Sequence, residues 1–325
     1  RPADSSLWFY GDTPDLMWIK NRSTTGLHTI TDTVRGVGLN LVTSSAAIET
    51  SYPGVTEMNK FGMSIINDST SILNGSGNSH VYWGWKGGGN AVSNATGNAS
   101  SVMISANPTA GFSVATGVSS GITGVITVGH GLGAAPSMVI FKNRDYADSH
   151  YVWHTSIGTA QNYLQLNSTA ATGSSTAIWG QIMSSTLVGL NQSSFFSAAN
   201  QKFVLYSWTA IPGYSAFGSY TGNGSADGTF VYLGFRPRFL LIKNTTTAGY
   251  SWILEDSVRD QYNVASTRLL PNTTDAEATG THLIDFLSNG FKLRNTDSNT
   301  NSVSGTSVYI YAAFAEIPFK FSRAR

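Results

Sequence analysis

Gly234-Phe235-Arg236-Pro237-Arg238-Phe239-Leu240-Leu241-Ile242-Lys243-Asn244 decides the fold, because the chain carries this pattern three times. The pattern reads Gly-x-x-Pro-x, then four large apolar residues, then Lys-Asn. Its earlier copies occupy 11–21 and 133–143. Agreement at so many positions indicates an internal repeat, so the chain divides into three related modules.

The physical reading of this pattern is a turn that leads into a buried strand. Glycine permits unusual backbone angles, and proline fixes φ and cannot donate to a central ladder. Four consecutive apolar residues can be covered on both faces of a sheet. We expect the lysine to end the strand with its stem on the sheet and its ammonium in water, and the asparagine to begin the next turn.

The remainder of each module predicts short strands. Alternating apolar residues, Asn/Ser/Thr turns and Gly-rich connectors recur, and helical periodicity is almost absent. We therefore predict an all-β fold of tandem antiparallel, jelly-roll-like β-sandwich modules. The expected modules are 1–106, truncated at its N-terminus, 107–210 and 211–325, and the best candidate for a helical turn is 275–278.

Composition limits the classes of partner. Charged residues make up 11% of the chain and the formal net charge is +1, against roughly 25% charged residues in ordinary soluble domains. Nucleic acid is not expected as a partner, because phosphate binding needs a concentrated Lys/Arg footprint. No apolar segment is long enough to insert into a membrane.

Cysteine is absent, which excludes disulfides, thiolate catalysis and cysteine metal sites, but does not identify the compartment. The chain begins with Arg1, in the middle of a module, and shows no signal-peptide pattern. We expect either processing or a piece of a longer protein.

Motifs for cofactors and metals are weak, and we predict neither. The segments 213–217 and 129–133 imitate a serine-nucleophile elbow and a dinucleotide loop, but strands follow where helices are required. His150 and His154 would share a strand face, and we interpret them as ordinary surface histidines. The oxygen-rich segment 295–301 could wrap calcium, but lacks the glycine and terminal acid of a strong calcium loop.

Acidic residues do not form an obvious catalytic pair, and we predict no enzyme and no catalytic residue. A glycosidase would need two carboxylates about 5–10 Å apart in a groove. Asp32 with Arg35 and Asp256 with Arg259 occupy equivalent positions in two modules, so a structural ion pair or turn cap explains them best. The other candidate acids are Glu255, Asp285 and Glu316.

Aromatic residues are the remaining candidates for a ligand-binding site. Each module closes on an aromatic strand, and in the first of these Trp83 and Trp85 share one face and precede Lys86 and three glycines. Exposed aromatic faces beside Asn, Ser and Thr bind neutral sugars by stacking and hydrogen bonds. Trp83, Trp85 and Trp179 are therefore the candidate ligand-binding residues, with core packing as the alternative.

The third module carries a resemblance to a known group of proteins. The segments 220–224, 234–237, 284–294 and 312–320 resemble the C-terminal repeats of large structural proteins in tailed bacteriophages, especially marine ones. The likeness is strongest over 213–325. That group has no assigned chemistry and is often found in tail fibres or elsewhere on the virion, so no functional residues are carried over.

The resemblance implies a protein on the virion surface, and hence extracellular. Its expected partners are other proteins of its own virion, a host-surface glycan, and further copies of itself, with a homotrimer favoured. The leading hypothesis is a tail-fibre-like appendage whose β modules present a carbohydrate-binding surface for host recognition. The first alternative is a purely structural spacer or capsid-decoration module, which would be favoured if all three tryptophans are buried. The second alternative is a glycan-cleaving enzyme.

Overall fold

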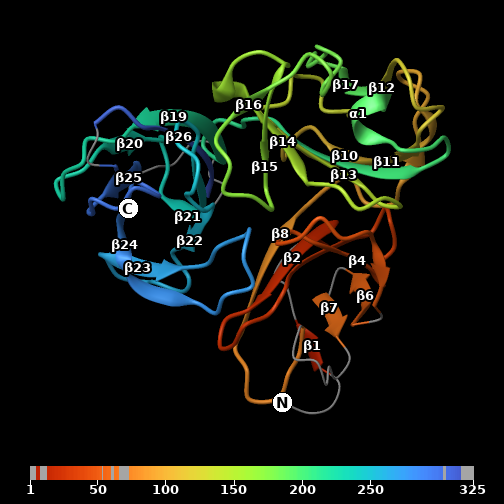
Figure 1. The fold of residues 1–325 in the computed structure, drawn as a ribbon. Coiled ribbons are helices and arrows are strands. Elements are labelled where there is room, and N and C mark those ends of the chain that lie inside the picture. Colours follow the sequence, from red (N-terminus) through yellow and green to blue (C-terminus); the bar gives the residue numbers. More distant parts are fainter. Residues whose placement is uncertain are drawn as a thin grey trace.

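The computed structural model describes residues 5–7, 13–52, 54–59, 62–65, 73–302 and 305–315, which form an almost entirely β structure with several antiparallel sheets (Figure 1). The prediction of an all-β, sandwich-type fold is confirmed. Helix in these residues is limited to single turns at η1 (Thr155–Ile157) and α1 (Gln192–Phe195). The turn predicted at 275–278 is not helical, because residue 278 begins a strand.

The first repeat forms two sheets, ordered β5-β4-β3-β2-β8 and β1-β7-β6. Its strands are β1 (Ser5–Leu7), β2 (Leu16–Asn21), β3 (His28–Asp32), β4 (Leu39–Val42), β5 (Thr50–Ser51), β6 (Val55–Asn59), β7 (Gly62–Ile65) and β8 (His80–Trp85).

The second repeat forms an eight-stranded sheet, β16-β15-β14-β13-β18-β11-β10-β9, and the pair β12-β17. The predicted boundary at 106/107 falls inside β10, which pairs with β11, so the change from first to second sheet lies near the glycines 87–89. Its strands are β9 (Val92–Ser93), β10 (Ser100–Asn107), β11 (Phe112–Val118), β12 (Val125–Gly129), β13 (Met138–Asn143), β14 (Tyr151–His154), β15 (Asn162–Gln165), β16 (Gly173–Ser174), β17 (Leu187–Asn191) and β18 (Lys202–Trp208).

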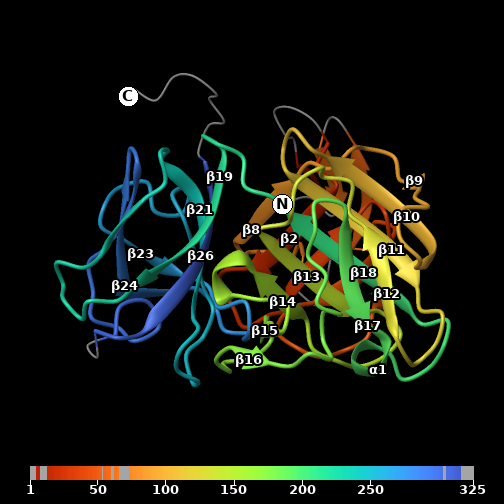
Figure 2. The same cartoon turned by 90° about the horizontal axis from the view of Figure 1, so that it is seen from above.

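The third repeat is a sandwich of the sheets β19-β26-β21-β22 and β20-β25-β24-β23. In Figure 2 it forms a separate lobe beside the other two repeats. The predicted boundary at 210/211 lies in the loop before its first strand. Its strands are β19 (Ser215–Thr221), β20 (Phe230–Tyr232), β21 (Pro237–Asn244), β22 (Ile253–Asp256), β23 (Ala265–Arg268), β24 (Ala278–Leu287), β25 (Gly290–Leu293) and β26 (Val308–Ala315).

The repeated apolar run forms the central strands β2, β13 and β21, and it is buried on both faces. In β21, Leu240 and Ile242 pack inside the sandwich of the third repeat. Phe239 and Leu241 point the opposite way and join a core cluster that contains residues of all three repeats. Strand β2 divides between two cores in the same manner, whereas the four apolar residues of β13 all lie in the shared cluster. Four successive apolar residues are needed because both faces of each of these strands are covered.

The three repeats surround a common centre with approximate threefold symmetry. Trp85, Trp208 and Phe314 occupy equivalent register positions, each opposite the first apolar residue of its central strand. The ring of Trp85 lies 5.9 Å from that of Trp208 and 5.6 Å from that of Phe314. Figure 1 shows the repeats as three lobes around this centre, in red to orange, yellow to green, and teal to blue.

The motif lysines do not keep their ammonium groups in water, contrary to the sequence-based expectation. Lys20, Lys142 and Lys243 are each 0% exposed. Burial lowers the pKa of each from 10.5 to about 8. Each ammonium donates to a carbonyl of its own hairpin loop and to one of a neighbouring repeat. The contacts between repeats are Lys20 to Thr274 (3.3 Å), Lys142 to Ala46 (3.1 Å) and Lys243 to Thr169 (3.2 Å).

The motif asparagines begin turns, as the sequence indicated. Asn21, Asn143 and Asn244 are buried, and each side-chain oxygen accepts from the backbone N–H groups two and three residues later. This capping aims the hairpin loop back over the strand end. The loop carbonyls then lie within reach of the preceding lysine.

A buried ion network joins the first and second repeats. Asp32 caps its turn by accepting from the N–H of Arg35 (2.8 Å), pairs with its guanidinium (2.5 Å), and accepts from the hydroxyl of Tyr206 (2.8 Å). Arg35 also pairs with Glu49, which binds Arg144 of the second repeat at 2.7 Å. The prediction of a structural ion pair and turn cap is confirmed.

The same network recurs between the third and first repeats. Asp256 pairs with Arg259 (2.6 Å) and accepts from the indole N–H of Trp83 (3.1 Å). Arg259 pairs with Glu277 (2.8 Å), and Glu277 binds Arg22 of the first repeat (2.8 Å). Residues at equivalent positions of the repeats therefore form the ion network at both of these junctions.

The junction between the second and third repeats has neutral groups in place of the ion network. His154 replaces the aspartate, and its Nε2 lies 3.1 Å from the carbonyl of Tyr311. Burial lowers the pKa of His154 to about 4, which keeps the ring neutral at pH 7. Thr172 and Thr245 take the places of the glutamate and its arginine partner and are joined by a backbone hydrogen bond of 3.0 Å.

We expect Lys142→Met to destabilise the protein by about 2–4 kcal/mol at pH 7, because it removes the donor from the partly buried carbonyls of Ala46 and Asp148. Lys202→Met is the matched control, since that side chain is 59% exposed and its ion pair is long, at 3.7 Å. Chemical denaturation of both variants measures the difference. Equal stability of the two variants would contradict a structural role for the buried ammonium.

The loss caused by Lys142→Met should increase with pH. The folded protein releases the proton of Lys142 near pH 8, whereas the unfolded chain holds it to about 10.5. Between these values the unfolded state binds more protons, so the contribution of Lys142 to stability rises with pH. Denaturation at pH 7 and pH 10 tests the sign, and a smaller loss at pH 10 would refute it.

Candidate functional site

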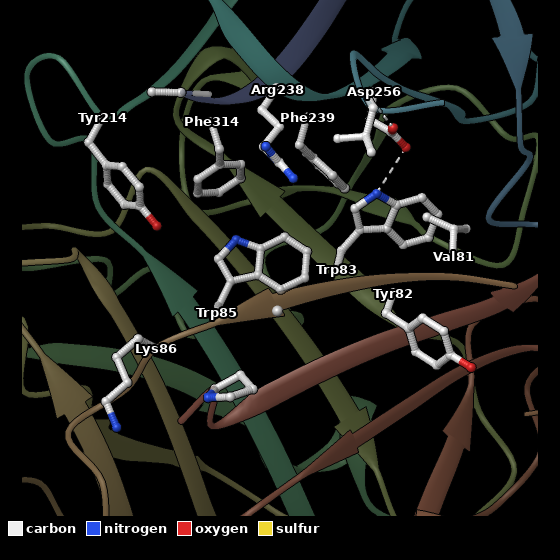
Figure 3. Close-up of a pocket in the computed structure, with 14 residues that line it drawn as sticks. Val81, Tyr82, Trp83, Trp85, Lys86, Tyr214, Arg238, Phe239, Asp256 and Phe314 are labelled. Carbon is white, nitrogen blue, oxygen red and sulfur yellow. Dashed lines mark hydrogen bonds between the residues drawn. The ribbon is translucent and has the colours of Figure 1, made fainter. Parts of the chain in front are cut away.

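A pocket of about 440 Å³ opens between the first and third repeats (Figure 3). We call it the inter-repeat pocket. Its lining from the first repeat is Pro14, Val81, Tyr82, Trp83, Gly84, Trp85 and Lys86, and from the third repeat Tyr214, Arg238, Phe239, Asp256, Val258, Phe314 and Ala315.

Trp83 and Trp85 lie on one face of β8, but that face points into the shared core. Their exposed fractions are only 8% and 6%, so the exposed indoles expected from the sequence are not present. The Trp85 ring makes edge contacts with Phe239 and Phe314 at 5.4 and 5.6 Å. The two tryptophans therefore belong to the core and expose little of their surface to the pocket.

The opposite wall comes from the third repeat. Phe239 leads the repeated apolar run, and Phe314 lies directly across from it on β26. Tyr214 precedes β19, packs at 6.1 Å from Phe314, and is half-buried, which raises the pKa of its hydroxyl. Figure 3 shows these side chains and Arg238 on one side of the pocket, with the tryptophans across from them.

Asp256 is the carboxylate of the pocket, and its oxygens are already engaged. One accepts from the indole N–H of Trp83 and from the guanidinium of Arg259. The other accepts from the backbone N–H groups of Val258 and Arg259. Donors from the protein therefore already occupy both oxygens of this carboxylate.

Two cations border the pocket. Lys86 pairs with Asp15 at 3.4 Å. Arg238 is exposed, and it has no ion-pair partner among the residues that the structure describes. The pocket thus combines aromatic side chains, a tyrosine hydroxyl, an engaged carboxylate and an exposed guanidinium, and this set can bind a polar ring non-covalently.

Trp179, the third candidate, lies in the core of the second repeat. It is 0% exposed, and its ring contacts Phe195 at 5.5 Å. Its indole has no exposed face on which a sugar could stack, so its role is packing. Trp179 was a candidate because its neighbours in the sequence are polar, but these neighbours do not leave its ring exposed in the fold.

The acids considered for catalysis are not brought together as free carboxylates. Asp32 and Asp256 serve in the two ion networks, and Asp285 pairs with Arg294 at 2.6 Å. Glu255 is 1% exposed inside the third sandwich, where burial raises its pKa well above 4.5. Glu316 lies outside the described residues. Asp256 is the one carboxylate among the described lining residues of the pocket.

The metal candidates are also built into the fold. His150 and His154 are each 0% exposed, so the prediction of surface histidines is wrong. In 295–301, Asp297 accepts from the backbone N–H of Asn299 and pairs with His282 at 3.1 Å. Protein donors therefore occupy this side-chain oxygen. Within the described parts of the chain, no group of three His, Cys, Asp or Glu residues could hold a metal ion.

Sequence reasoning missed several residues. Phe239 and Phe314 were interpreted only as strand residues, and Arg238 only as part of the repeat. Two exposed aromatics of the third repeat were also missed: Tyr232 in β20 is 63% exposed, and Tyr262 in the loop between β22 and β23 is 85% exposed. The alternation in Phe-Val-Tyr at 230–232 was the available signal for an exposed strand face.

Comparison with known proteins gives one match. Residues 3–318 match the family described as "Domain of unknown function (DUF7483)". No curated protein and no solved structure matches the chain. No helix within the described ranges is both long and apolar enough to cross a bilayer.

We expect Trp85→Ala to destabilise the protein by about 3–5 kcal/mol, because it opens a cavity where three repeats meet. Tyr232→Ala should change stability by less than about 0.5 kcal/mol, since that ring is exposed. Thermal and urea unfolding of both variants measures this. A Trp85 variant as stable as the Tyr232 variant would show that the indole does not support the core.

Proposed function

The chain belongs to the DUF7483 family, and on this premise we propose that it is a tail-fibre-like appendage protein on the virion surface of a tailed phage, with a carbohydrate-binding site in the inter-repeat pocket. Binding to a host-surface glycan would be non-covalent. The partners under this proposal are other virion proteins and the glycan.

The pocket is the observation that carries the proposal. Its volume of about 440 Å³ lies within the usual range of roughly 300–1,000 Å³ for small-ligand sites. Its walls join aromatic carbon to a few polar groups, which suits a sugar that has apolar C–H patches and hydroxyls. Its lining comes from two repeats that are tied by the Asp256–Trp83 hydrogen bond, so it is largely pre-formed.

Composition and architecture support the setting. A surface rich in Ser, Thr, Asn and Gly with a net charge of +1 suits an exposed structure with little non-specific attraction. Because the three repeats share one core, we expect them to unfold together, which suits an exposed appendage. Repetition within an appendage also provides many copies of a weak site, which raises avidity.

A purely structural spacer or capsid-decoration module is the alternative. The burial of Trp83, Trp85 and Trp179 favours it, since none of these rings presents an open face. A glycan-cleaving enzyme has less support, because a glycosidase needs a pair of carboxylates and the described lining supplies Asp256 alone.

The homotrimer expected from the resemblance stays a prediction. The threefold contacts seen here are internal to one chain, so a trimer would need a further surface. The mass of the protein in solution tests it.

We expect Val258→Trp to block glycan binding while leaving the fold intact. Val258 lines the pocket and is 48% exposed, so a larger ring there obstructs the opening without disturbing the core. Ile122→Trp is the matched control, because Ile122 is 50% exposed in the second repeat. Labelled protein is pulled down on candidate host cells, with and without periodate oxidation of their glycans.

Binding that disappears on oxidation and with Val258→Trp, but survives Ile122→Trp, supports the proposal. Folded protein that binds neither host cells nor a broad glycan panel would refute the carbohydrate site and leave the structural alternative. Binding that is unaffected by Val258→Trp would place the site outside the pocket.

A further inference from the structure

We propose that the inter-repeat pocket selects a sugar that carries an oxyanion, a carboxylate or a sulfate, and that Arg238 is the residue that binds this group. The inference rests on the proposed carbohydrate site and specifies its ligand class. It is carried by the charges around the pocket and by comparison of the three repeats.

Arg238 is the cation that the fold leaves available. It is exposed at the start of β21 and lines the pocket beside Phe239. The other charged groups are engaged, since Asp256 pairs with Arg259 and Lys86 pairs with Asp15. Among the described residues, Arg238 has no acidic partner, so an anionic group entering the pocket would meet an unneutralised guanidinium.

The three repeats carry different residues at the position of Arg238, and these residues differ in their contacts. Asp15, Ser137 and Arg238 each precede the first apolar residue of their central strand. Asp15 is 2% exposed and accepts from the hydroxyl of Thr33 at 2.9 Å. The hydroxyl oxygen of Ser137 accepts from the N–H of Ala210 at 3.1 Å. Both are tied into the fold, whereas the side chain of Arg238 has no such contact with the part of the chain that the structure describes.

The chemistry of arginine narrows the chemical class of the ligand. Its planar guanidinium matches the two oxygens of a carboxylate or sulfate with paired hydrogen bonds. Figure 3 shows Arg238 extending toward the tryptophans, next to the apolar wall. A sugar ring packed against the aromatic wall of the pocket could direct an acidic substituent toward Arg238. A neutral sugar would leave that charge without a partner.

The test measures binding of the full chain to three probes by calorimetry. The probes are a uronic-acid oligosaccharide, the same oligosaccharide after reduction of its carboxyl groups, and a sulfated neutral oligosaccharide. We expect Arg238→Gln to weaken binding of the anionic probes by about 10- to 100-fold, the usual range for a lost charge-assisted hydrogen bond. Carboxyl reduction should have a similar effect on the wild-type protein.

Lys202→Gln is the control, because it removes one positive charge from an exposed side chain of the second repeat. It should leave binding of every probe unchanged. The melting temperatures of both variants should equal that of the wild type, which separates loss of the ligand contact from loss of the fold.

Loss of anionic binding with Arg238→Gln alone supports the inference, and the preferred probe distinguishes a carboxylate from a sulfate. Equal binding of the acidic and reduced oligosaccharides, or an Arg238→Gln variant that binds like the wild type, overturns the inference and leaves the carbohydrate site standing. Failure of folded protein to bind any glycan, neutral or anionic, overturns the proposed function and this inference together.

Discussion

The buried ammonium of the motif lysine, shared between its own loop and the next repeat, is the contact on which the ring of repeats depends. Taking an ammonium out of water is costly unless its protons are bonded. Lys20, Lys142 and Lys243 meet this condition with backbone carbonyls from two repeats each. A repeat that lost its neighbour would expose or orphan this charge, so the junctions favour a closed arrangement.

The charged networks around Asp32 and Asp256 follow the same constraint. An aspartate buried without its arginine would be an uncompensated charge, so these residues must be present or absent together. The junction between the second and third repeats illustrates this, because His154, Thr172 and Thr245 replace the charged set with neutral hydrogen bonds. The same geometry is thus achieved by two kinds of chemistry.

The candidate site results from this architecture. The aromatic centre reaches the surface between the first and third repeats, so Trp83, Trp85, Phe239 and Phe314 belong to the core and line the pocket at once. Such residues cannot vary without loss of stability. For the proposed site, specificity would therefore be carried by the rim, where Arg238 is exposed and forms no ion pair with any residue that the structure describes.

The sequence by itself determined the repeat, the all-β class, the two-sided burial of the apolar run and the Asp–Arg pairs, because each depends on local periodicity or on residues three positions apart. It also placed Trp83 and Trp85 on one strand face. Only the tertiary structure decided that this face, and the ammonium of Lys20, would be covered, since the covering groups come from repeats more than 150 residues away, at Asp256 and Thr274. The pocket likewise exists only once the first and third repeats meet, because both repeats line it.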